Sequence, residues 1–104
     1  MFFFGPSTDL KPAAFVEKLK AEGGVVIDCR TPMETLGGTW PGAKCIDWNA
    51  GAMETAWKTL DPAKPHYLYC RSGARSGAAT SFLKSKGFKE VYNLGGYDGI
   101  ARLA

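Results

Sequence analysis

The stretch Cys70-Arg71-Ser72-Gly73-Ala74-Arg75-Ser76 is the most informative part of the sequence for both the fold and the candidate site. It follows the apolar run Tyr67-Leu68-Tyr69, which is typical of a buried strand, and a helix-forming segment begins at Ser76. A loop that opens a helix presents unpaired backbone N–H groups, and the helix dipole adds partial positive charge there. This arrangement stabilises an anion, including the thiolate of Cys70, which is the reactive form of cysteine.

The loop itself is the candidate site, with Cys70 as the candidate nucleophile. Gly73 gives the backbone the freedom to turn its amides toward one point, and the two arginines carry charges that are not titrated at neutral pH. A lone cysteine at a strand end is more often a packing residue, but such a residue has no use for two neighbouring arginines. The residues expected to bind the anion are Arg71, Ser72, Gly73, Ala74, Arg75 and Ser76.

Length, charge and cysteine content limit the possible functions. The 104 residues predict a single domain over 1–104. The net charge of +3 comes with scattered lysines rather than a basic stripe with interleaved aromatics, so we expect a small anionic partner and no nucleic acid. No apolar run approaches the roughly 20 residues that span a bilayer, so no membrane association is expected. We interpret residues 1–4 as a short edge strand rather than a signal peptide.

The three cysteines include no C-x-x-C pair, and the sequence has a single histidine. This pattern argues against a disulfide framework and against a zinc site, and it is typical of a protein in the reducing cytoplasm. We expect no metal and no cofactor.

Helical and extended segments alternate along the chain. The patterns predict helices over 12–22, 51–60 and 76–86, strands over 25–27, 43–48, 66–69 and 91–93, and a helical turn after Gly95-Gly96. This order predicts an α/β domain with a mainly parallel central sheet flanked by helices. Because ligands bind at the carboxyl ends of parallel strands, we expect Asp28-Cys29-Arg30 to share an edge with Cys70.

Four segments of the chain resemble, in order and at the same spacing, the motifs of single-domain rhodaneses, the thiosulfate sulfurtransferase family. Residues 26–34 resemble hydrophobic-D-x-R-x-P-x-E, residues 38–43 resemble G-H-I-P-G-A, residues 70–76 resemble C-R-x-G-x-R-S, and residues 86–96 resemble K-G-F-x-x-V-x-x-L-x-G-G. Thr35 and Thr39 stand where the family usually has an aromatic residue and a histidine, and the tryptophan that commonly follows the Gly-Gly pair is missing, with Tyr97 near that place. These departures concern packing and leave the nucleophile and its loop intact.

The resemblance implies a rhodanese-like three-layer fold and a two-step sulfur transfer. The Cys70 thiolate would take a sulfane sulfur from thiosulfate or a similar donor, carry it as a persulfide, and pass it to a thiol or to cyanide. The amides of residues 71–76 would bind the persulfide through charge-assisted hydrogen bonds of roughly 1.5–3 kcal/mol each. Arg71 and Arg75 would attract the anionic donor.

Three other functions are compatible with the same loop to different degrees. One is a persulfide relay carrier that is loaded by a protein donor. Another is a cysteine phosphatase or arsenate reductase, although those enzymes use C-x5-R, and the shorter C-x4-R of Cys70 and Arg75 suits a single sulfur. The acid that a phosphatase needs could come from Asp28, Asp47 or Asp98. A catalytically inactive regulatory module is disfavoured because Cys70 is present.

Arg30 and Glu34 lie four residues apart. We interpret them as a structural ion pair, with Asp28 nearby, that holds the loop after the strand. Ser76 either donates a hydrogen bond to the persulfide or caps the helix, and both interpretations stay open.

The other two cysteines are interpreted as packing residues. Cys29 stands where the family has a valine, which favours a small core residue; a resolving role toward Cys70 is the less favoured hypothesis. Cys45 has only the packing interpretation.

Overall fold

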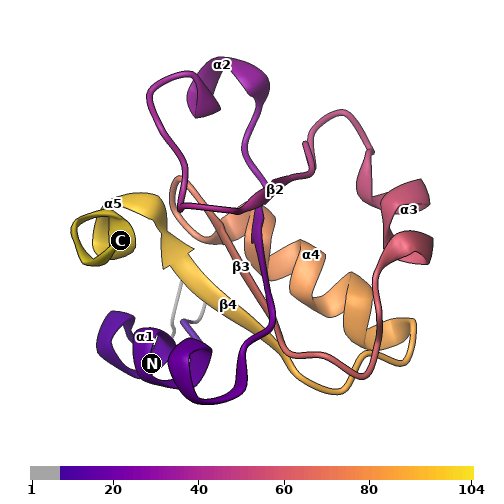
Figure 1. Ribbon diagram of the computed structural model, residues 1–104. Helices are drawn as coiled ribbons and strands as arrows, with labels where there is room; N and C mark the ends of the chain where they lie inside the picture. The colour runs from indigo at the N-terminus through magenta and orange to yellow at the C-terminus, as the bar shows by residue number, and fades with distance from the viewer. Residues whose placement is uncertain (1–7) are drawn as a thin grey trace, which may run out of the picture.

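The structure, a computed structural model, describes residues 8–104 (Figure 1). The helices are α1 (Pro12–Glu22), α2 (Pro32–Thr35), α3 (Met53–Ala56), α4 (Ala74–Ser85) and α5 (Tyr97–Ile100), the strands are β1 (Val25–Asp28), β2 (Lys44–Cys45), β3 (His66–Cys70) and β4 (Val91–Gly96), and 3-10 turns cover Trp57–Thr59 and Ala101–Leu103. The edge strand expected at residues 1–4 lies outside the described residues.

The strands form one sheet in the order β2-β1-β3-β4, and every neighbouring pair is parallel. This confirms the prediction of a mainly parallel central sheet. Asp28 lies opposite Tyr69, and Cys70 lies opposite Gly96. The carboxyl ends of β1, β3 and β4 therefore meet at one edge, and the segment that carries α2 projects beyond that edge (Figure 1).

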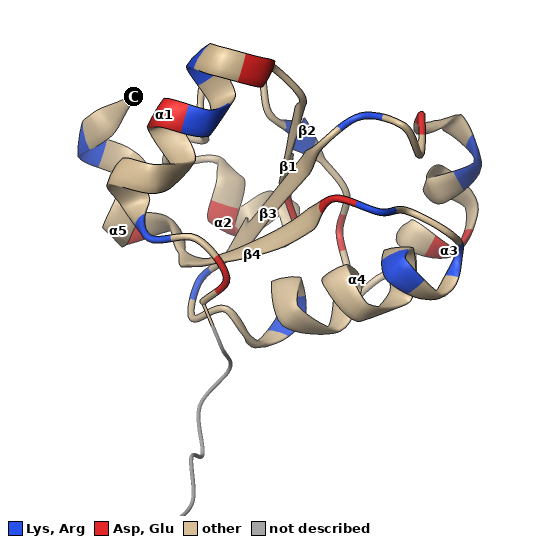
Figure 2. Ribbon diagram, turned by 90° about the horizontal axis from the view of Figure 1, so that it is seen from below, with Lys and Arg blue, Asp and Glu red and all other residues tan. Residues whose placement is uncertain are grey.

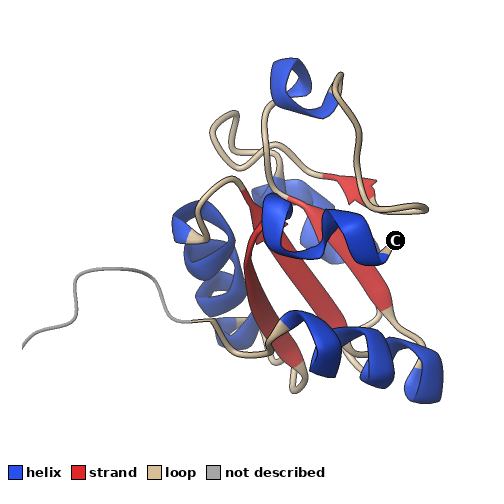
Figure 3. Ribbon diagram, turned by 90° about the vertical axis from the view of Figure 1, so that its left-hand side faces the viewer, coloured by secondary structure: helices blue, strands red, loops and turns tan. Residues whose placement is uncertain are grey.

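Helices cover both faces of the sheet, so the molecule has three layers, as the resemblance implies (Figure 3). Side chains alternate along β3, so Leu68 and Cys70 pack on the α3 and α4 side, while Tyr67 and Tyr69 pack on the α1 and α5 side. Each face buries its own apolar cluster. The position of Cys70 in the first cluster places its sulfur between the sheet and the start of α4.

The helix at Pro12–Glu22 has the predicted boundaries. Pro12 occupies the first turn, where its missing N–H costs nothing, and Phe15 is fully buried. Gly23 ends the helix with a φ of 71°, a backbone conformation that favours glycine.

The strand predicted over 43–48 is only two residues long, Lys44–Cys45. Among the strands of residues 8–104, it lies at the edge of the sheet and pairs with β1 alone. Its side chains are consequently exposed, so the packing interpretation of Cys45 is wrong.

The fourth helix begins at Ala74 rather than at Ser76. Its N-cap is Gly73, with a φ of 98° in the left-handed region, and Ser76 lies within the first turn. The capping interpretation of Ser76 is therefore wrong. On this helix Ala79 and Leu83 are buried, whereas Ala78 is exposed.

Acidic and basic residues are interspersed over the elements in the view of Figure 2. Within residues 8–104, none of the helices is both long and apolar enough to cross a membrane.

Candidate active site

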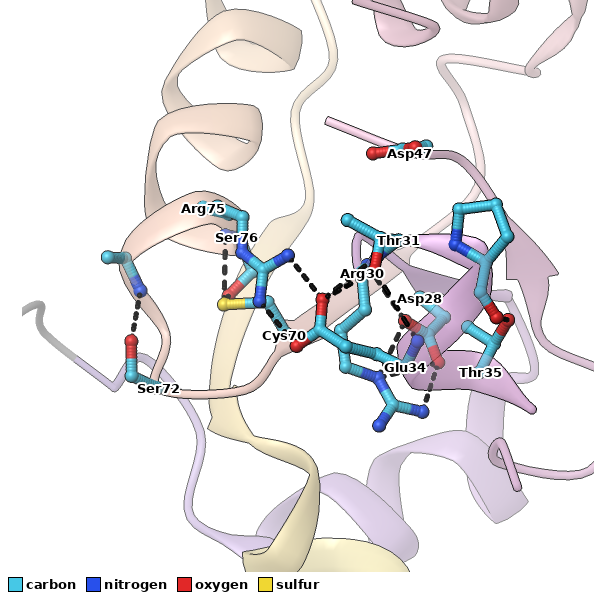
Figure 4. A network of polar contacts seen from close by, with 12 residues as sticks. Asp28, Arg30, Thr31, Glu34, Thr35, Asp47, Cys70, Ser72, Arg75 and Ser76 are labelled. Carbon is cyan, nitrogen blue, oxygen red and sulfur yellow. Dashed lines mark hydrogen bonds and ion pairs between the residues drawn. The ribbon is translucent and has the colours of Figure 1, made fainter. Parts of the chain in front are cut away.

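Cys70 is the last residue of β3, directly before the loop that leads into α4, and its side chain is fully buried. The backbone N–H of Gly73 donates to the Cys70 sulfur at 3.0 Å. Ser76 donates through its backbone N–H at 3.5 Å and through its hydroxyl at 3.4 Å (Figure 4). The loop thus surrounds one sulfur atom with hydrogen-bond donors.

These contacts decide the protonation of the thiol. Burial is the largest single influence on the pKa of Cys70 and raises it. The hydrogen bonds from the hydroxyl and N–H of Ser76 and from the N–H groups of Gly73 and Ser72 act in the opposite direction. Their sum outweighs burial, so the pKa of Cys70 is lowered and the thiolate is favoured.

The loop lies tightly against the end of β4. A Cβ atom at Gly96 would lie 2.5 Å from the carbonyl oxygen of Arg71, closer than two such atoms approach. A side chain at position 96 would therefore push the loop away from the sheet and move its amides.

The Arg75 guanidinium lies beside the Cys70 sulfur and is held by Glu34 (Figure 4). Its Nη1 donates to one carboxylate oxygen at 2.7 Å and its Nη2 to the other at 2.9 Å. Glu34 also accepts from the N–H and the hydroxyl of Thr31, both at 3.1 Å, in a capping box at the start of α2. The hydrogen bonds from Arg75, more than those from Thr31, lower the pKa of Glu34 to about 2.

The expected ion pair between Arg30 and Glu34 is therefore wrong. Arg30 pairs instead with the buried Asp28, through Nη2 at 2.8 Å and Nε at 3.0 Å. It also donates to the carbonyl of Gly38 at 2.7 Å, and its guanidinium lies 4.4 Å from the centre of the Tyr97 ring. The pair of Arg30 with Asp28 lies in the loop after β1, and the pair of Glu34 with Arg75 connects α2 to the Cys70 loop.

Asn93, a site residue that no sequence motif marked, lies on β4 and is buried. Its Nδ2 donates to the carbonyl of Gly73 at 3.0 Å, and its Oδ1 accepts from the Ser76 hydroxyl at 2.7 Å and from the N–H of Gly95 at 3.0 Å. Asn93 therefore fixes Gly73 and Ser76, two of the residues that donate to the sulfur. The sequence signal that could have marked Asn93 is a polar side chain in an otherwise mainly apolar, buried strand.

Cys29 lies next to Cys70 across the sheet. Its N–H donates to the carbonyl of Tyr69 at 2.9 Å, and the two cysteines belong to the same apolar cluster. Cys29 is fully buried, and this burial raises the pKa of its thiol well above the ordinary range. Its position agrees with the interpretation as a small core residue.

A hollow of about 280 Å³ lies beside the loop. It is lined by Arg30, Glu34, Arg71, Tyr97 and Asp98. A larger hollow of about 370 Å³ follows the outer surface of α4 and is lined by neither loop arginine. We therefore regard the smaller hollow as the entrance to the site.

The three candidate acids of a phosphatase have different surroundings. The carboxylate of Asp28 is engaged by Arg30, and that of Asp47 accepts the N–H of Ala50 at 3.3 Å. Asp98 is exposed and lines the entrance hollow.

Comparison with known proteins places this geometry in a family. The model of the rhodanese-like domain matches residues 11–103. The chain is 32% identical to the thiosulfate sulfurtransferase GlpE of Pseudomonas putida over 87 residues, 84% of this chain and 77% of that protein. It is 38% identical over 71 residues to the protein YqhL of Bacillus subtilis, 68% of this chain but only 55% of that protein.

Among solved structures, a rhodanese-related protein from Thermoplasma volcanium has a TM-score of 0.77 at 28% identity, with 94% of each chain covered. The fold and the similarity to GlpE together support a sulfurtransferase activity. The chain belongs to the rhodanese-like domain family.

Proposed function

We propose that this protein is a sulfurtransferase that carries a sulfane sulfur on Cys70. The donor is thiosulfate or a similar small anion, and the acceptor is a thiol or cyanide. The observation that carries the proposal is the set of hydrogen-bond donors that converges on the buried Cys70 sulfur and lowers its pKa. The similarity to a thiosulfate sulfurtransferase over most of the chain supports the same substrate class.

In the first step the Cys70 thiolate attacks the outer sulfur of thiosulfate. A sulfur–sulfur bond forms to Cys70, the sulfur–sulfur bond of thiosulfate breaks, and sulfite leaves with the electron pair. The proposal assigns no general base, because the loop donors lower the pKa of Cys70 and favour its thiolate. The exposed Arg71 attracts the dianion, and the resulting persulfide anion takes over the loop N–H groups as donors.

The geometry favours sulfur transfer over phosphate ester hydrolysis. In the latter, an arginine fork must bind the oxyanion, yet both arms of the Arg75 fork are occupied by Glu34. Asp28, which ends the neighbouring strand, is committed to Arg30 and is not placed to protonate a leaving group.

Intact-protein mass spectrometry after incubation with thiosulfate tests the proposal. Wild type is expected to gain the mass of one sulfur atom and lose it again with cyanide. Cys70→Ser should gain nothing, and Cys45→Ser, which removes an exposed thiol away from the loop, should behave like wild type. No gain in wild type would contradict thiosulfate as donor and favour loading by a protein donor, and a gain that Cys45→Ser abolishes would contradict the assignment of Cys70.

A further inference from the structure

The entrance hollow contains two charged side chains that no other residue within 8–104 neutralises. Of its charged lining residues, Arg30 and Glu34 are already paired. The side chains of Arg71 and Asp98 have neither a hydrogen bond nor an ion pair with any other described residue. As far as the described part of the chain is concerned, the hollow thus offers a bound molecule one free cation and one free anion.

These two charges come from elements that are fixed relative to each other. Arg71 is the first residue after the nucleophile, and its backbone packs against Gly96. Asp98 lies in the first turn of α5, two residues further along. The close approach at Gly96 therefore sets the positions from which both side chains enter the hollow, next to the Cys70 loop.

We propose that the sulfur acceptor is a zwitterionic aminothiol, a thiol that carries the free α-ammonium and α-carboxylate of an amino acid, and that it binds in this hollow. Arg71 pairs with its carboxylate and Asp98 with its ammonium group. The proposal rests on the sulfur transfer proposed above and names the substrate class of its second step.

Other small reactants match the hollow less well. A dianionic donor is attracted by Arg71 but repelled by Asp98, and cyanide offers no cationic group to Asp98. The volume of about 280 Å³ lies just below the roughly 300–1,000 Å³ of sites for drug-sized ligands, so it suits a molecule about the size of an amino acid or the end of a larger one.

The transfer step balances without an oxidant. The acceptor thiol loses its proton to water, and its thiolate attacks the outer sulfur of the Cys70 persulfide. A sulfur–sulfur bond forms to the acceptor, the bond to Cys70 breaks, and Cys70 keeps the electron pair as a thiolate. Cys70 is then ready for another donor, and the acceptor leaves as a persulfide.

Four acceptor thiols test the contribution of each charge. L-cysteine has both the carboxylate and the ammonium group, 3-mercaptopropionate has only the carboxylate, cysteamine has only the ammonium group, and 2-mercaptoethanol has neither. The protein is first loaded with sulfur, and the rate of its loss from Cys70 is followed by mass for wild type, Arg71→Gln and Asp98→Asn. Each rate is divided by that for 2-mercaptoethanol with the same variant. Comparing variants for one thiol then cancels its intrinsic reactivity. Arg102→Gln and Glu17→Gln remove exposed charges outside the hollow and serve as controls.

For Arg71→Gln the ratios for L-cysteine and 3-mercaptopropionate should fall by about fivefold, while the ratio for cysteamine stays the same. For Asp98→Asn the ratios for L-cysteine and cysteamine should fall by a similar factor, while that for 3-mercaptopropionate does not fall. The controls should change none of them. Ratios that do not move, or that move alike for all three charged thiols, would overturn the proposal even though Cys70 accepts sulfur.

A binding measurement on the unloaded protein is independent of the donor. Titration with S-methyl-L-cysteine, which has both charges but no reactive thiol, should shift the backbone NMR signals of Arg71 and Asp98, and each variant should weaken the binding. If thiosulfate fails to load Cys70 but this binding occurs, the donor is wrong and the acceptor site stands. If no signal around the hollow shifts, the acceptor site is wrong.

Discussion

Cys29 and Cys70 occupy nearly equivalent places in the sheet but have opposite chemistry. Each lies at the carboxyl end of one of two neighbouring parallel strands, both are fully buried, and both belong to the same apolar cluster. Burial raises the pKa of the Cys29 thiol, whereas the pKa of Cys70 is lowered. Residue type, burial and place in the fold therefore do not account for the opposite pKa shifts of the two thiols.

The difference lies in the backbone that follows each cysteine. After Cys70 the chain turns into α4, and the N–H groups of Gly73 and Ser76 point back at the sulfur. After Cys29 the next N–H, that of Arg30, donates to the Asp28 carboxylate at 2.9 Å instead. A buried thiol becomes a nucleophile here because the following loop supplies donors, and it stays inert where the loop supplies them to another group.

Replacing each cysteine in turn should give the largest difference in sulfur-transfer rate. Cys70→Ser should abolish sulfur transfer to cyanide, because the sulfur carrier is gone. Cys29→Val should keep the rate within about twofold, because a volume-conserving apolar change in the core is tolerated. Steady-state rates with thiosulfate check both variants, and a large loss in Cys29→Val would contradict the inert role of Cys29.

Removal of one hydrogen-bond donor to the Cys70 sulfur should bring the pKa of Cys70 closer to that of Cys29. Ser76→Ala deletes the hydroxyl that lies 3.4 Å from the Cys70 sulfur. A hydrogen bond to a charged group contributes about 1.5–3 kcal/mol, so the pKa of Cys70 should rise by about one unit or more. The ultraviolet absorbance of the thiolate, titrated with pH, measures it.

Thr80→Val is the matched control for Ser76→Ala, because it deletes a buried hydroxyl of the same helix that donates to the Ser76 carbonyl at 2.8 Å. It should lower stability without a comparable change in the pKa of Cys70. A pKa that stays the same in Ser76→Ala would contradict the donor account.

Loss of Asn93 should act on the loop rather than on the sulfur directly. Asn93→Ala removes the buried hydrogen bonds that its side chain makes with the Gly73 carbonyl and the Ser76 hydroxyl, so the free energy of unfolding should fall by about 1–3 kcal/mol. The sulfur-transfer rate should fall several-fold, because the donors become less fixed. Denaturant unfolding and steady-state rates measure both effects, and the exposed Asn49→Ala serves as control. A rate equal to that of wild type would show that Asn93 does not position the loop.

The smallest effect concerns Glu34, which holds Arg75 beside the sulfur. The folded protein lowers the pKa of Glu34 from 4.5 to about 2, so the folded state binds less proton there than the unfolded state. The stabilisation is therefore complete above pH 4.5 and is lost as the pH falls toward 2. Wild type should have a higher Tm than Glu34→Gln at neutral pH, and the gap should close in acid. A gap that does not depend on pH would contradict the ion pair.

Local sequence signals accounted for much of the fold. The helix at Pro12–Glu22 is bounded by a proline and a glycine, and β3 has an uninterrupted apolar run, so both could be predicted from neighbouring residues. The Cys70 loop could be predicted as a site for the same reason, since its donors lie within six residues of the nucleophile.

Contacts between distant segments could not be predicted in this way. Glu34 pairs with Arg75, 41 residues away, rather than with Arg30, because α2 is a single turn and Arg30 is taken by Asp28. Asn93 reaches Gly73 across 20 residues. No periodic pattern marks such pairs, because they depend on which strands become neighbours in the sheet.

The most direct test compares the two thiols in the same protein. Thiolate absorbance is titrated with pH for wild type, Cys70→Ser and Cys29→Val, and each variant curve is subtracted from the wild-type curve. The difference for Cys70 should have a midpoint below the value of about 8.5 for an ordinary thiol, and that for Cys29 should show no transition while the protein stays folded. A Cys70 midpoint at or above about 8.5, or two cysteines that titrate together, would contradict the account.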